Sequence, residues 1–536
     1  MWRRLPSLRL EGFRIPDRSE PMTAAKPASA LHRGSQFATL AAALLGWMFD
    51  GFEMGLFPLI GKPALRDLLG PEADPAISDQ WFGVIMAVFL VGAASGGVFF
   101  GWLGDKIGRV KAMSLSIFTY AVLTGLCGFA TEAWHIAVLR FIASLGMGGE
   151  WSLGVALVNE IWPGKSRAFI AGLIGSASNV GFLLVALLSI GLTQVIGGIE
   201  NVLLGIGMSQ ATADNLLQNS AWRFLMITGA FPALLIFFIR LFVPESSRWE
   251  EERATGKTSN WNNVDLIGVM IGCLAAIGII LIWSPIANAV PKSVAIIATL
   301  VGLVVALLGF LFPVRQYLQR TVAAGALTQQ ASSTVLKRML LGATLAGIAL
   351  LGTWGSLQWA PRWAGELKPD IPATAEAPAQ KFYAAQLTQT ATALGAIVST
   401  ILAAVAAGRY GRRPTYAVLS LGSFLSAVYF YRFHSTFDTQ FLLAAFLAGG
   451  VTASFYGFFP LYFPELFPTS VRATGQGFSF NFGRILAAIG GLQTVNLMKE
   501  FDNSFAKAGS LMAAIYLLGV FVIWLGPETH GQELPE

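Results

Sequence analysis

Long apolar runs alternate with short polar stretches along most of the chain. An α-helix needs about 20 apolar residues to cross the hydrocarbon core of a bilayer, and soluble domains do not repeat runs of that length. The pattern therefore predicts a polytopic α-helical membrane protein with fourteen spans. The spans form a group of six, a pair and a second group of six, at residues 37–60, 81–103, 112–130, 134–158, 168–196, 221–243, then 264–286 and 293–314, then 339–360, 382–407, 415–431, 440–463, 473–497 and 511–525.

Composition supports the same class. Of the 536 residues, 54% are apolar and 12% are charged, whereas an average soluble domain is roughly 25% charged. The net charge of +6 does not indicate nucleic-acid binding, because the basic residues fall in short loops, as orientation in a membrane requires. The two cysteines, Cys127 and Cys273, lie inside apolar runs. They are typical of small core residues and imply neither a disulfide framework nor a metal site.

The loop charges predict the orientation of the spans. With the N-terminus inside, the inner loops hold an excess of Lys and Arg, whereas the outer loops hold mixed charge. This predicts cytoplasmic N- and C-termini in a bacterial-type inner (plasma) membrane. The expected domains are a disordered cytoplasmic tail, an N-terminal six-helix bundle, a cytoplasmic linker with an inserted two-helix hairpin, a C-terminal six-helix bundle and a cytoplasmic tail, at residues 1–36, 37–243, 244–338, 339–526 and 527–536.

Two patterns repeat between the halves. The spacing E-x-x-P-x-x-x-R occurs at residues 160–167 and again at 465–472, an offset of 305 residues (465 minus 160). The basic turn GWLGDKIGRVK at residues 101–111 has a weaker copy at 404–413. An even number of spans in each half relates the halves by an axis along the membrane normal. The pair of spans within residues 264–314 has no counterpart and is predicted to be an inserted hairpin.

These stretches resemble the major facilitator superfamily. GWLGDKIGR resembles the loop between its second and third spans, and PESSRW (244–249) and PETHG (527–531) resemble its sugar-porter-like branches. Other stretches look more like its proton-coupled symporters of organic acids, such as the sialate and aromatic-acid groups: RFIASLGMGGEW (140–151), PELFPTSVRATGQGFSFNFGR (464–484) and FDGFE (49–53). The resemblance covers about residues 37–531 apart from the hairpin. It implies a secondary transporter built from two six-helix bundles in pseudo-twofold relation.

Three departures from the family pattern bear on the substrate. Gly408 stands where Asp105 would align, so only the first half keeps the full turn motif. The seventh span, with GTWGSLQWAPRW at residues 352–363, lacks the glutamine-rich pattern of hexose porters. The fifth span, with GSASNVGF at residues 175–182, lacks their pattern as well. A simple hexose transporter is therefore disfavoured.

Three carboxylates inside the predicted spans are candidates for proton coupling. Asp50 and Glu53 lie three residues apart on one face of the first span, and Glu150 lies in the fourth span. An ionisable group inside a bilayer costs at least ~2.5–3.5 kcal/mol, so it usually faces a cavity and has a partner. A buried carboxylic acid can hold a proton near neutral pH, which suits a proton carrier. Alternatively, Asp50 only pairs with Arg140, and Glu150 only supports helix packing.

Arg484, in the eleventh of the twelve repeat-related spans, is a candidate anchor for an anionic substrate. Arginine offers planar paired donors that match a carboxylate. Asn179 lies 305 residues earlier (484 minus 179), so one cavity could have an amide on one wall and a cation on the other. Alternatively, Arg484 only donates to backbone carbonyls of a neighbouring helix. The other candidate substrate-binding residues, each of which could equally be a packing residue, are Arg140, Trp354, Gln358, Tyr456 and Asn481.

Charged residues at the predicted cytoplasmic helix ends form a third group. The resemblance implies that they latch the two halves together when the inner side is closed, through contacts that form in one state only. The alternative is topology alone, which explains the arginines but not the acids at matched positions. The expected gate residues are Asp105, Arg109, Glu160, Arg167, Glu245, Arg412, Glu465 and Arg472.

The sequence holds no catalytic set. Its histidines, His32, His135, His434 and His530, lie in the tails or near loop ends, and no nucleophile motif, phosphate loop or metal spacing occurs. We therefore expect a protein that is not an enzyme and that needs no cofactor and no metal. Its expected partners are protons, the lipid bilayer and a small anionic substrate, with no nucleic acid, and we expect a monomer.

The pattern and the resemblance together favour proton-coupled symport of a small organic anion by alternating access. The anion would be a sugar acid or an aromatic or other mono-carboxylate. The alternatives are a drug/proton antiporter with fourteen spans, a sugar transporter, and a non-transporting membrane sensor on the same fold. The glycine and proline pattern of the antiporters is not evident in the fifth span, and the mid-membrane charges argue against a sensor.

Overall fold

The structure is a computed structural model that describes residues 33–161, 167–234, 236, 262–287, 290–325, 327–369, 383–468 and 471–535. Long helices dominate this part of the chain, and ten helical stretches within it are long and apolar enough to cross a membrane. The chain is therefore an all-helical membrane protein, as predicted. The total of fourteen spans is not confirmed. The predicted spans at residues 134–158, 221–243, 415–431 and 473–497 are not among these ten stretches, and residues 237–261 lie outside the description.

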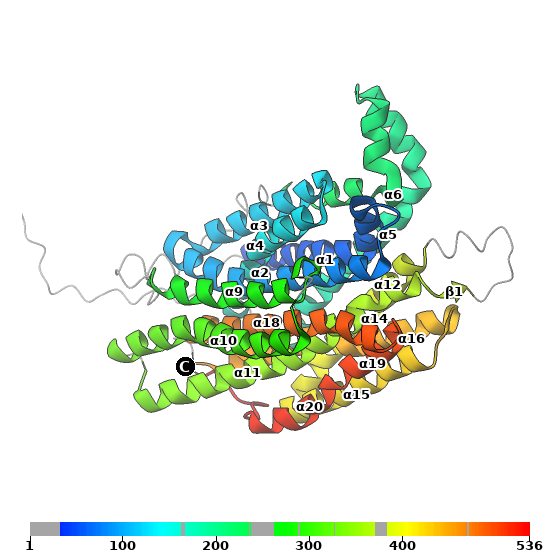
Figure 1. Ribbon diagram of the computed structural model, residues 1–536. Coiled ribbons are helices and arrows are strands. Elements are labelled where there is room, and N and C mark those ends of the chain that lie inside the picture. Colours follow the sequence, from blue (N-terminus) through cyan, green and yellow to red (C-terminus); the bar gives the residue numbers. More distant parts are fainter. Residues whose placement is uncertain are drawn as a thin grey trace, which may run out of the picture.

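The helices of the first half follow one another in the predicted order. They are α1 (Arg33–Leu69), α2 (Pro75–Ile107), α3 (Arg109–Leu126), the short 3-10 helix η2 (Cys127–Phe129), α4 (Ala133–Ile161), α5 (Arg167–Gly205) and α6 (Gln210–Thr228). In Figure 1 they gather in one group, in blue to green. The predicted boundary of this bundle at residue 243 lies outside the described residues.

The second half forms the other group in Figure 1. Two of its predicted spans are broken, one at Ser454 between α16 and α17, and the last at Ala514 between α19 and α20. Its helices are α11 (Gln329–Gly355), η4 (Leu357–Trp359), α12 (Ala360–Ala364), α14 (Ala384–Tyr410), α15 (Arg412–Arg432), α16 (Thr439–Ala453), α17 (Phe455–Leu466), α18 (Arg472–Glu500), α19 (Phe505–Ala513), α20 (Ile515–Val522) and η6 (Ile523–Leu525). The short strands β1 (Lys368–Pro369) and β2 (Thr436–Phe437) pair in parallel.

The pair of helices between the two halves forms a close hairpin. It consists of α9 (Asp265–Ile282) and α10 (Lys292–Ala323), with η3 (Pro285–Ala287) between them. Gly268 and Gly272 on α9 meet Gly309 on α10, where an added Cβ would lie 2.6–2.7 Å from backbone atoms. This is the small-residue contact by which helices approach closely in membranes. Asp265 and Arg320 close one end with two hydrogen bonds of 2.6 and 2.7 Å. α9 packs on α2, and α10 packs on α11 and α18.

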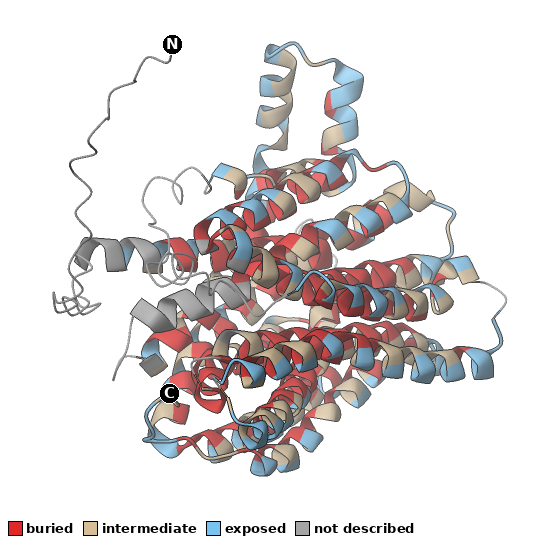
Figure 2. Cartoon of the chain, turned by 90° about the vertical axis from the view of Figure 1, so that its left-hand side faces the viewer, coloured by how far each residue is buried: buried red, intermediate tan, exposed pale blue. Residues whose placement is uncertain are grey.

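The two halves meet mainly along three helix pairs. α2 packs on α18, and α5 packs on α14 and on α17. Small residues permit the approach, since a Cβ at Gly175 on α5 would lie 2.8 Å from the backbone of Tyr456. The buried residues follow these contacts through the interior in Figure 2, whereas many large apolar side chains on the outer faces are exposed. An exposed apolar belt is what a bilayer-embedded protein requires.

The polar stretch predicted between the fifth and sixth spans is helical. α5 continues to Gly205 and α6 begins at Gln210, so the two form a projecting hairpin, which rises from the bundle at the top of both views (Figures 1 and 2). Three successive residues, Asn219 to Ala221, have φ between +50 and +64° and separate the hairpin from the membrane part of α6. Asp67 holds this bend by accepting hydrogen bonds from Asn219 and Trp222. Sequence reasoning missed the hairpin because its helical turns carry few charges and many glycines.

The repeated basic turns share one backbone conformation. Gly108 in the first turn has φ 109° and ψ 151°, and Gly411 in the second has φ 100° and ψ 161°. Only glycine adopts this region readily. In both halves one helix ends at the glycine and the next begins directly after it. The sequence repeat is therefore a repeat in structure.

Candidate functional site

A cavity lies between the two groups of helices, and both contribute to its walls. α1 and α5 line it from the first half, and α11, α12, α14, α16, α17 and α18 line it from the second half. It encloses about 1070 Å³, part of which opens to solvent. Six of the predicted site residues line this cavity: Asp50, Asn179, Trp354, Gln358, Tyr456 and Arg484.

Arg484 contributes a positively charged side chain to the cavity wall. Its side chain is 8% exposed, and its Nη1 donates to Asn481 Oδ1 at 3.0 Å and to the carbonyl of Ala93 on α2 at 3.4 Å. The guanidinium also lies 4.9 Å from the centre of the Phe480 ring. Among the described residues, the remaining N–H groups of Arg484 have no hydrogen-bond acceptor. The predicted alternative, a bond to a backbone carbonyl, is thus present but uses one nitrogen only.

Asn179 faces the same cavity from α5, as the 305-residue offset predicted. Its amide Nδ2 donates to Gly175 O one turn earlier, at 2.8 Å. This bond uses one of the two N–H groups of the amide. Asn179 and Arg484 therefore bring an amide and a cation to one cavity from opposite halves.

Asp50 and Glu150 form a pair of buried carboxyl groups at the cavity. Asp50 lines the cavity and Glu150 lies within hydrogen-bonding reach of it from α4. The Glu150 side chain passes over Gly46 of α1, where an added Cβ would lie 1.7 Å from Glu150 Oε1. Arg484 lines the same cavity as Asp50. Two carboxyl groups this close share a proton more easily than they carry two charges.

Glu53 and Arg140 are placed differently from Asp50, because neither lines the cavity. Glu53 Oε1 lies 3.2 Å from Arg140 Nη1, and the two side chains are 0% and 1% exposed. Thr124 donates to the same carboxylate oxygen at 3.1 Å. The rings of Phe57 and Phe89 cover the guanidinium at 5.2 and 4.6 Å. The partner of Arg140 is therefore Glu53 and not Asp50, which leaves Asp50 available to the cavity.

Asn481, the last predicted substrate-binding residue, also lies outside the cavity lining. Its Oδ1 accepts from Arg484, and its amide contacts α2 at Gly97, where a Cβ would lie 1.9 Å from Nδ2. Asn481 thus positions Arg484 at the contact of α2 with α18.

Several cavity residues escaped the sequence reasoning. Trp47 and Met54 flank Asp50 at one helical turn on either side, and Phe182 follows Asn179 by three residues. Helical spacing from the charged residues would have found these three. Gln389 and Thr452 lie on helices without a charged marker, so no sequence signal identified them. Together with Phe480 and Trp354, the aromatic residues give the cavity flat apolar walls beside Arg484.

The second-half part of the predicted gate is a buried ion pair. Arg412 donates to Glu465 through Nε at 2.9 Å and through Nη2 at 2.7 Å, and their side chains are 6% and 2% exposed. Thr529, in the C-terminal tail, donates to Glu465 Oε2 at 2.6 Å. Arg472 donates to the carbonyls of Pro464, Phe467 and Pro535. These contacts all lie within the second half.

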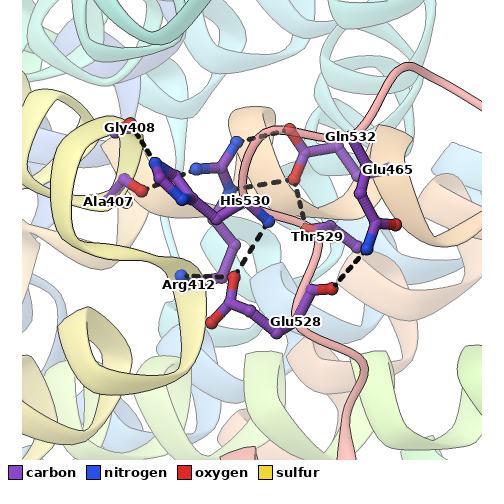
Figure 3. Close-up of polar contacts among 8 residues, drawn as sticks. All are labelled: Ala407, Gly408, Arg412, Glu465, Glu528, Thr529, His530 and Gln532. Atoms are coloured by element: carbon purple, nitrogen blue, oxygen red, sulfur yellow. Dashed lines mark hydrogen bonds and ion pairs between the residues drawn. The ribbon is translucent and has the colours of Figure 1, made fainter.

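The C-terminal tail supplies the acid that the second turn lacks. Glu528 accepts from the backbone N–H groups of Arg412 at 2.9 Å and His530 at 3.0 Å (Figure 3). It also accepts from the backbone N–H of Arg413 at 3.0 Å, so it joins the tail to the start of α15. Partial burial opposes the charge, but these donors outweigh it and hold the pKa of Glu528 below its ordinary value. A carboxylate at a helix N-terminus is also favoured by the helix dipole.

The first-half part of the gate lies outside what the structure describes. The side chains of Asp105, Arg109, Glu160 and Arg167 fall there, and so does residue Glu245. A latch between the halves therefore stays a prediction.

The opposite end of the bundle holds charge pairs that sequence reasoning missed. Arg362 on α12 pairs with Asp79 on α2, and Lys62 on α1 pairs with Glu366 at 3.0 Å. Phe82 and Trp359 pack together beside them, with ring centres 4.9 Å apart. Both pairs join the first half to the second. No sequence signal marks them, because the partners are 283 and 304 residues apart and were assigned to loops and span ends.

Within the described residues, no group of three or more His, Cys, Asp or Glu side chains could hold a metal ion. The cavity chemistry consists of one cation, a carboxyl pair, amides, hydroxyls and aromatic rings.

Comparison with known proteins points to one family. The family described as sugar (and other) transporter matches residues 34–265 and 378–536. The cis,cis-muconate transport protein of Acinetobacter baylyi is 26% identical, over 83% of this chain and 84% of its own. A sialic acid transporter of Escherichia coli is 31% identical, over 42% of this chain and 48% of its own. In structure, the chain is similar to the proton:xylose symporter XylE, with a TM-score of 0.59 at 17% identity over 93% of this chain and 98% of that one. The last similarity shows the fold alone.

Proposed function

The chain belongs to the sugar (and other) transporter family of the major facilitator superfamily and is a membrane transporter, not an enzyme, and from this premise we propose that it carries a small organic anion together with protons. The observation that carries the proposal is the cavity that Arg484 and Asp50 line from opposite halves. The substrate class is a sugar acid or an aromatic or other mono-carboxylate. The relatives named as muconate and sialic acid transporters support an organic acid.

Arg484 is the proposed anchor for the substrate carboxylate. A guanidinium presents planar paired donors that match a carboxylate. Arg484 uses Nη1 within the protein and keeps its other donors available. Trp354, Tyr456 and Gln358 line the cavity beside it, and the rings suit a flat organic body. Asn179 offers a polar contact from the opposite wall.

Asp50 is the proposed proton carrier, with Glu150 as its partner. Asp50 lines the same cavity as Arg484, and a nearby positive charge favours the ionised form of a carboxyl group. A bound carboxylate neutralises Arg484, and Asp50 with Glu150 then takes up a proton more readily. Substrate binding and proton binding therefore favour each other, which is the coupling that symport needs. Glu53 has no such role in this proposal, because Arg140 neutralises it outside the cavity.

Transport proceeds by alternating access between the two halves. The contacts of α2 with α18 and α5 with α14 are the surfaces that would rearrange. The gate of Asp105, Arg109, Glu160, Arg167, Glu245, Arg412, Glu465 and Arg472 is proposed for the cytoplasmic side. Cytoplasmic termini, a bacterial-type inner membrane and a monomeric state complete the proposal.

Uptake into proteoliposomes tests the proposal. The purified protein would be reconstituted, a pH gradient imposed with the acidic side outside, and labelled benzoate, nicotinate, cis,cis-muconate and sialic acid supplied. Accumulation of at least one acid, abolished by a protonophore, is expected. If no acid accumulates and the vesicles expel cationic dyes, the protein is a drug antiporter. Accumulation of neutral hexoses alone would make it a sugar transporter.

A further inference from the structure

A second cavity lies beside the central one, at the end of the bundle that the loop charges assign to the outside. It encloses about 580 Å³, including space that opens to solvent. Pro361 of α12 lines both cavities, so the short helix α12 separates them. Figure 1 shows α12 between the two groups of helices, at the end away from the C-terminus.

Two cations line the second cavity, Lys62 and Arg362. Arg362 is 5% exposed, so its charge is almost fully withdrawn from water. Its Nη2 donates to Asp79, and its guanidinium lies 5.3 Å from the centre of the Phe82 ring. Among the described residues, Nε and Nη1 of Arg362 have no hydrogen-bond partner. An arginine presents donors along a planar fork, and buried donors without acceptors are costly.

Both cations are held by carboxylates from the opposite half of the protein. Arg362 of the second half pairs with Asp79 of the first, and Lys62 of the first half pairs with Glu366 of the second. Both cations therefore already bind carboxylate groups in this structure. An entering carboxylate thus competes with a contact that joins the halves.

We propose that the second cavity is a separate binding site for a carboxylate anion, in which the anion competes with Asp79 for the Arg362 guanidinium. The proposal rests on the proposed transport of an organic anion, since the same anion occupies both sites in turn. Arg362 supplies the directional donors and Lys62 supplies a second positive charge. When the anion takes Arg362, the pair with Asp79 opens. The anion thus binds best when this end of the protein is open, which biases the equilibrium toward that state.

Competition between the anion and Asp79 predicts that substitutions of Asp79 and of Arg362 change anion binding in opposite directions. Asp79→Asn removes the competing carboxylate and should tighten anion binding at this site. Arg362→Gln removes the donor fork and should abolish it. A pair that is structural only would give effects of the same sign for both substitutions.

The test measures binding of benzoate to purified full-length protein by titration calorimetry. The measurement uses Arg484→Gln, which removes benzoate binding at the central cavity, so that the remaining binding reports the second cavity alone. In this background, weak benzoate binding should remain, Asp79→Asn should tighten it by about tenfold, as one charge-assisted hydrogen bond allows, and Arg362→Gln should remove it. Lys292→Gln, which removes an exposed cation on α10 that pairs with Glu500, should change nothing. Arg362→Lys, which keeps the charge, should retain part of the binding.

Each outcome decides between the two sites. Complete loss of binding in Arg484→Gln alone overturns the second site and leaves the central site standing. Unchanged tight binding in Arg484→Gln overturns the central site instead. Weaker binding in both Asp79→Asn and Arg362→Gln, with melting temperatures like that of the parent, overturns the competition.

Discussion

Arg484 on α18 and Asp50 on α1 line one cavity from opposite halves of the protein. A substrate that neutralises the cation changes the environment of the acid in the same step. This relationship makes the cavity suited to carry an anion and a proton together. It also separates Asp50 from its neighbour Glu53, which Arg140 neutralises.

Asp50→Asn is expected to uncouple transport. The amide cannot carry a proton, so pH-driven accumulation of labelled substrate in proteoliposomes should be lost, while exchange of labelled for unlabelled substrate continues. Glu132→Gln, at an exposed carboxylate before α4, is the matched control and should behave as wild type. If accumulation survives in Asp50→Asn but not in Glu150→Gln, the proton carrier is Glu150.

Glu53→Gln is expected to destabilise the protein. Removing one member of a buried ion pair leaves an uncompensated charge and costs roughly 3–5 kcal/mol. Glu500→Gln breaks the exposed pair with Lys292, in which the side chains are 61% and 68% exposed, and should change stability little, because water screens an exposed ion pair. Unfolding in mixed micelles with increasing SDS measures both free energies. Equal costs for the two variants would show that the Glu53–Arg140 pair contributes no special stability.

The sequence could predict those site residues that helical spacing or the internal repeat relates to one another. The 305-residue offset predicted that Asn179 and Arg484 share one cavity, and both residues line it, because repeat-related positions in parallel halves face a common axis. Which acid pairs with Arg140 could not be predicted, since Asp50 and Glu53 share a helix face and differ only in what packs opposite. The pair of Arg362 with Asp79 depends on how the halves dock. Local patterns carry no information on that docking.

The same limit applies to the fold. Apolar runs predicted the long helices, because a bilayer imposes their length. The breaks at Ser454 and Ala514 depend on packing within the second half. The missing acid of the second turn comes from Glu528, 117 residues after Gly411 (528 minus 411), and not from the turn itself.

Docking of the C-terminal tail is expected to depend on pH through Glu528. Its pKa is lower in the folded protein than in the free tail, so its contribution is fully present above the ordinary glutamate value of 4.5. The contribution is lost as the pH falls through the lower, folded value. Hydrogen exchange at the amides of Arg412 and Arg413, corrected for the intrinsic effect of pH, should therefore rise in acid.

Glu528→Gln should raise the same exchange rates already at pH 7. Glu533→Gln, at a nearby carboxylate of the tail, serves as its control and should leave the rates unchanged. Protection that is identical in Glu528→Gln and wild type would show that other contacts dock the tail.

Gly411→Ala is expected to strain the second basic turn. The residue has φ 100° and ψ 161°, and an added Cβ would lie 3.1 Å from Glu528 Oε2. A side chain in such a backbone region costs of order 1–3 kcal/mol. Gly101→Ala, in the helix before the first turn and with open space around its Cβ, should cost nothing or stabilise slightly. The free energies of unfolding in SDS distinguish the two, and an unaffected Gly411→Ala would contradict the assigned turn.

The most direct test of the account is equilibrium binding of labelled benzoate to purified wild-type protein and to Arg484→Gln. Loss of a charge-assisted anchor should weaken the tight binding by at least about tenfold. Arg432→Gln, which removes an exposed arginine at the end of α15, should bind as wild type does. Retained tight binding in Arg484→Gln would contradict the central claim that Arg484 holds the anion.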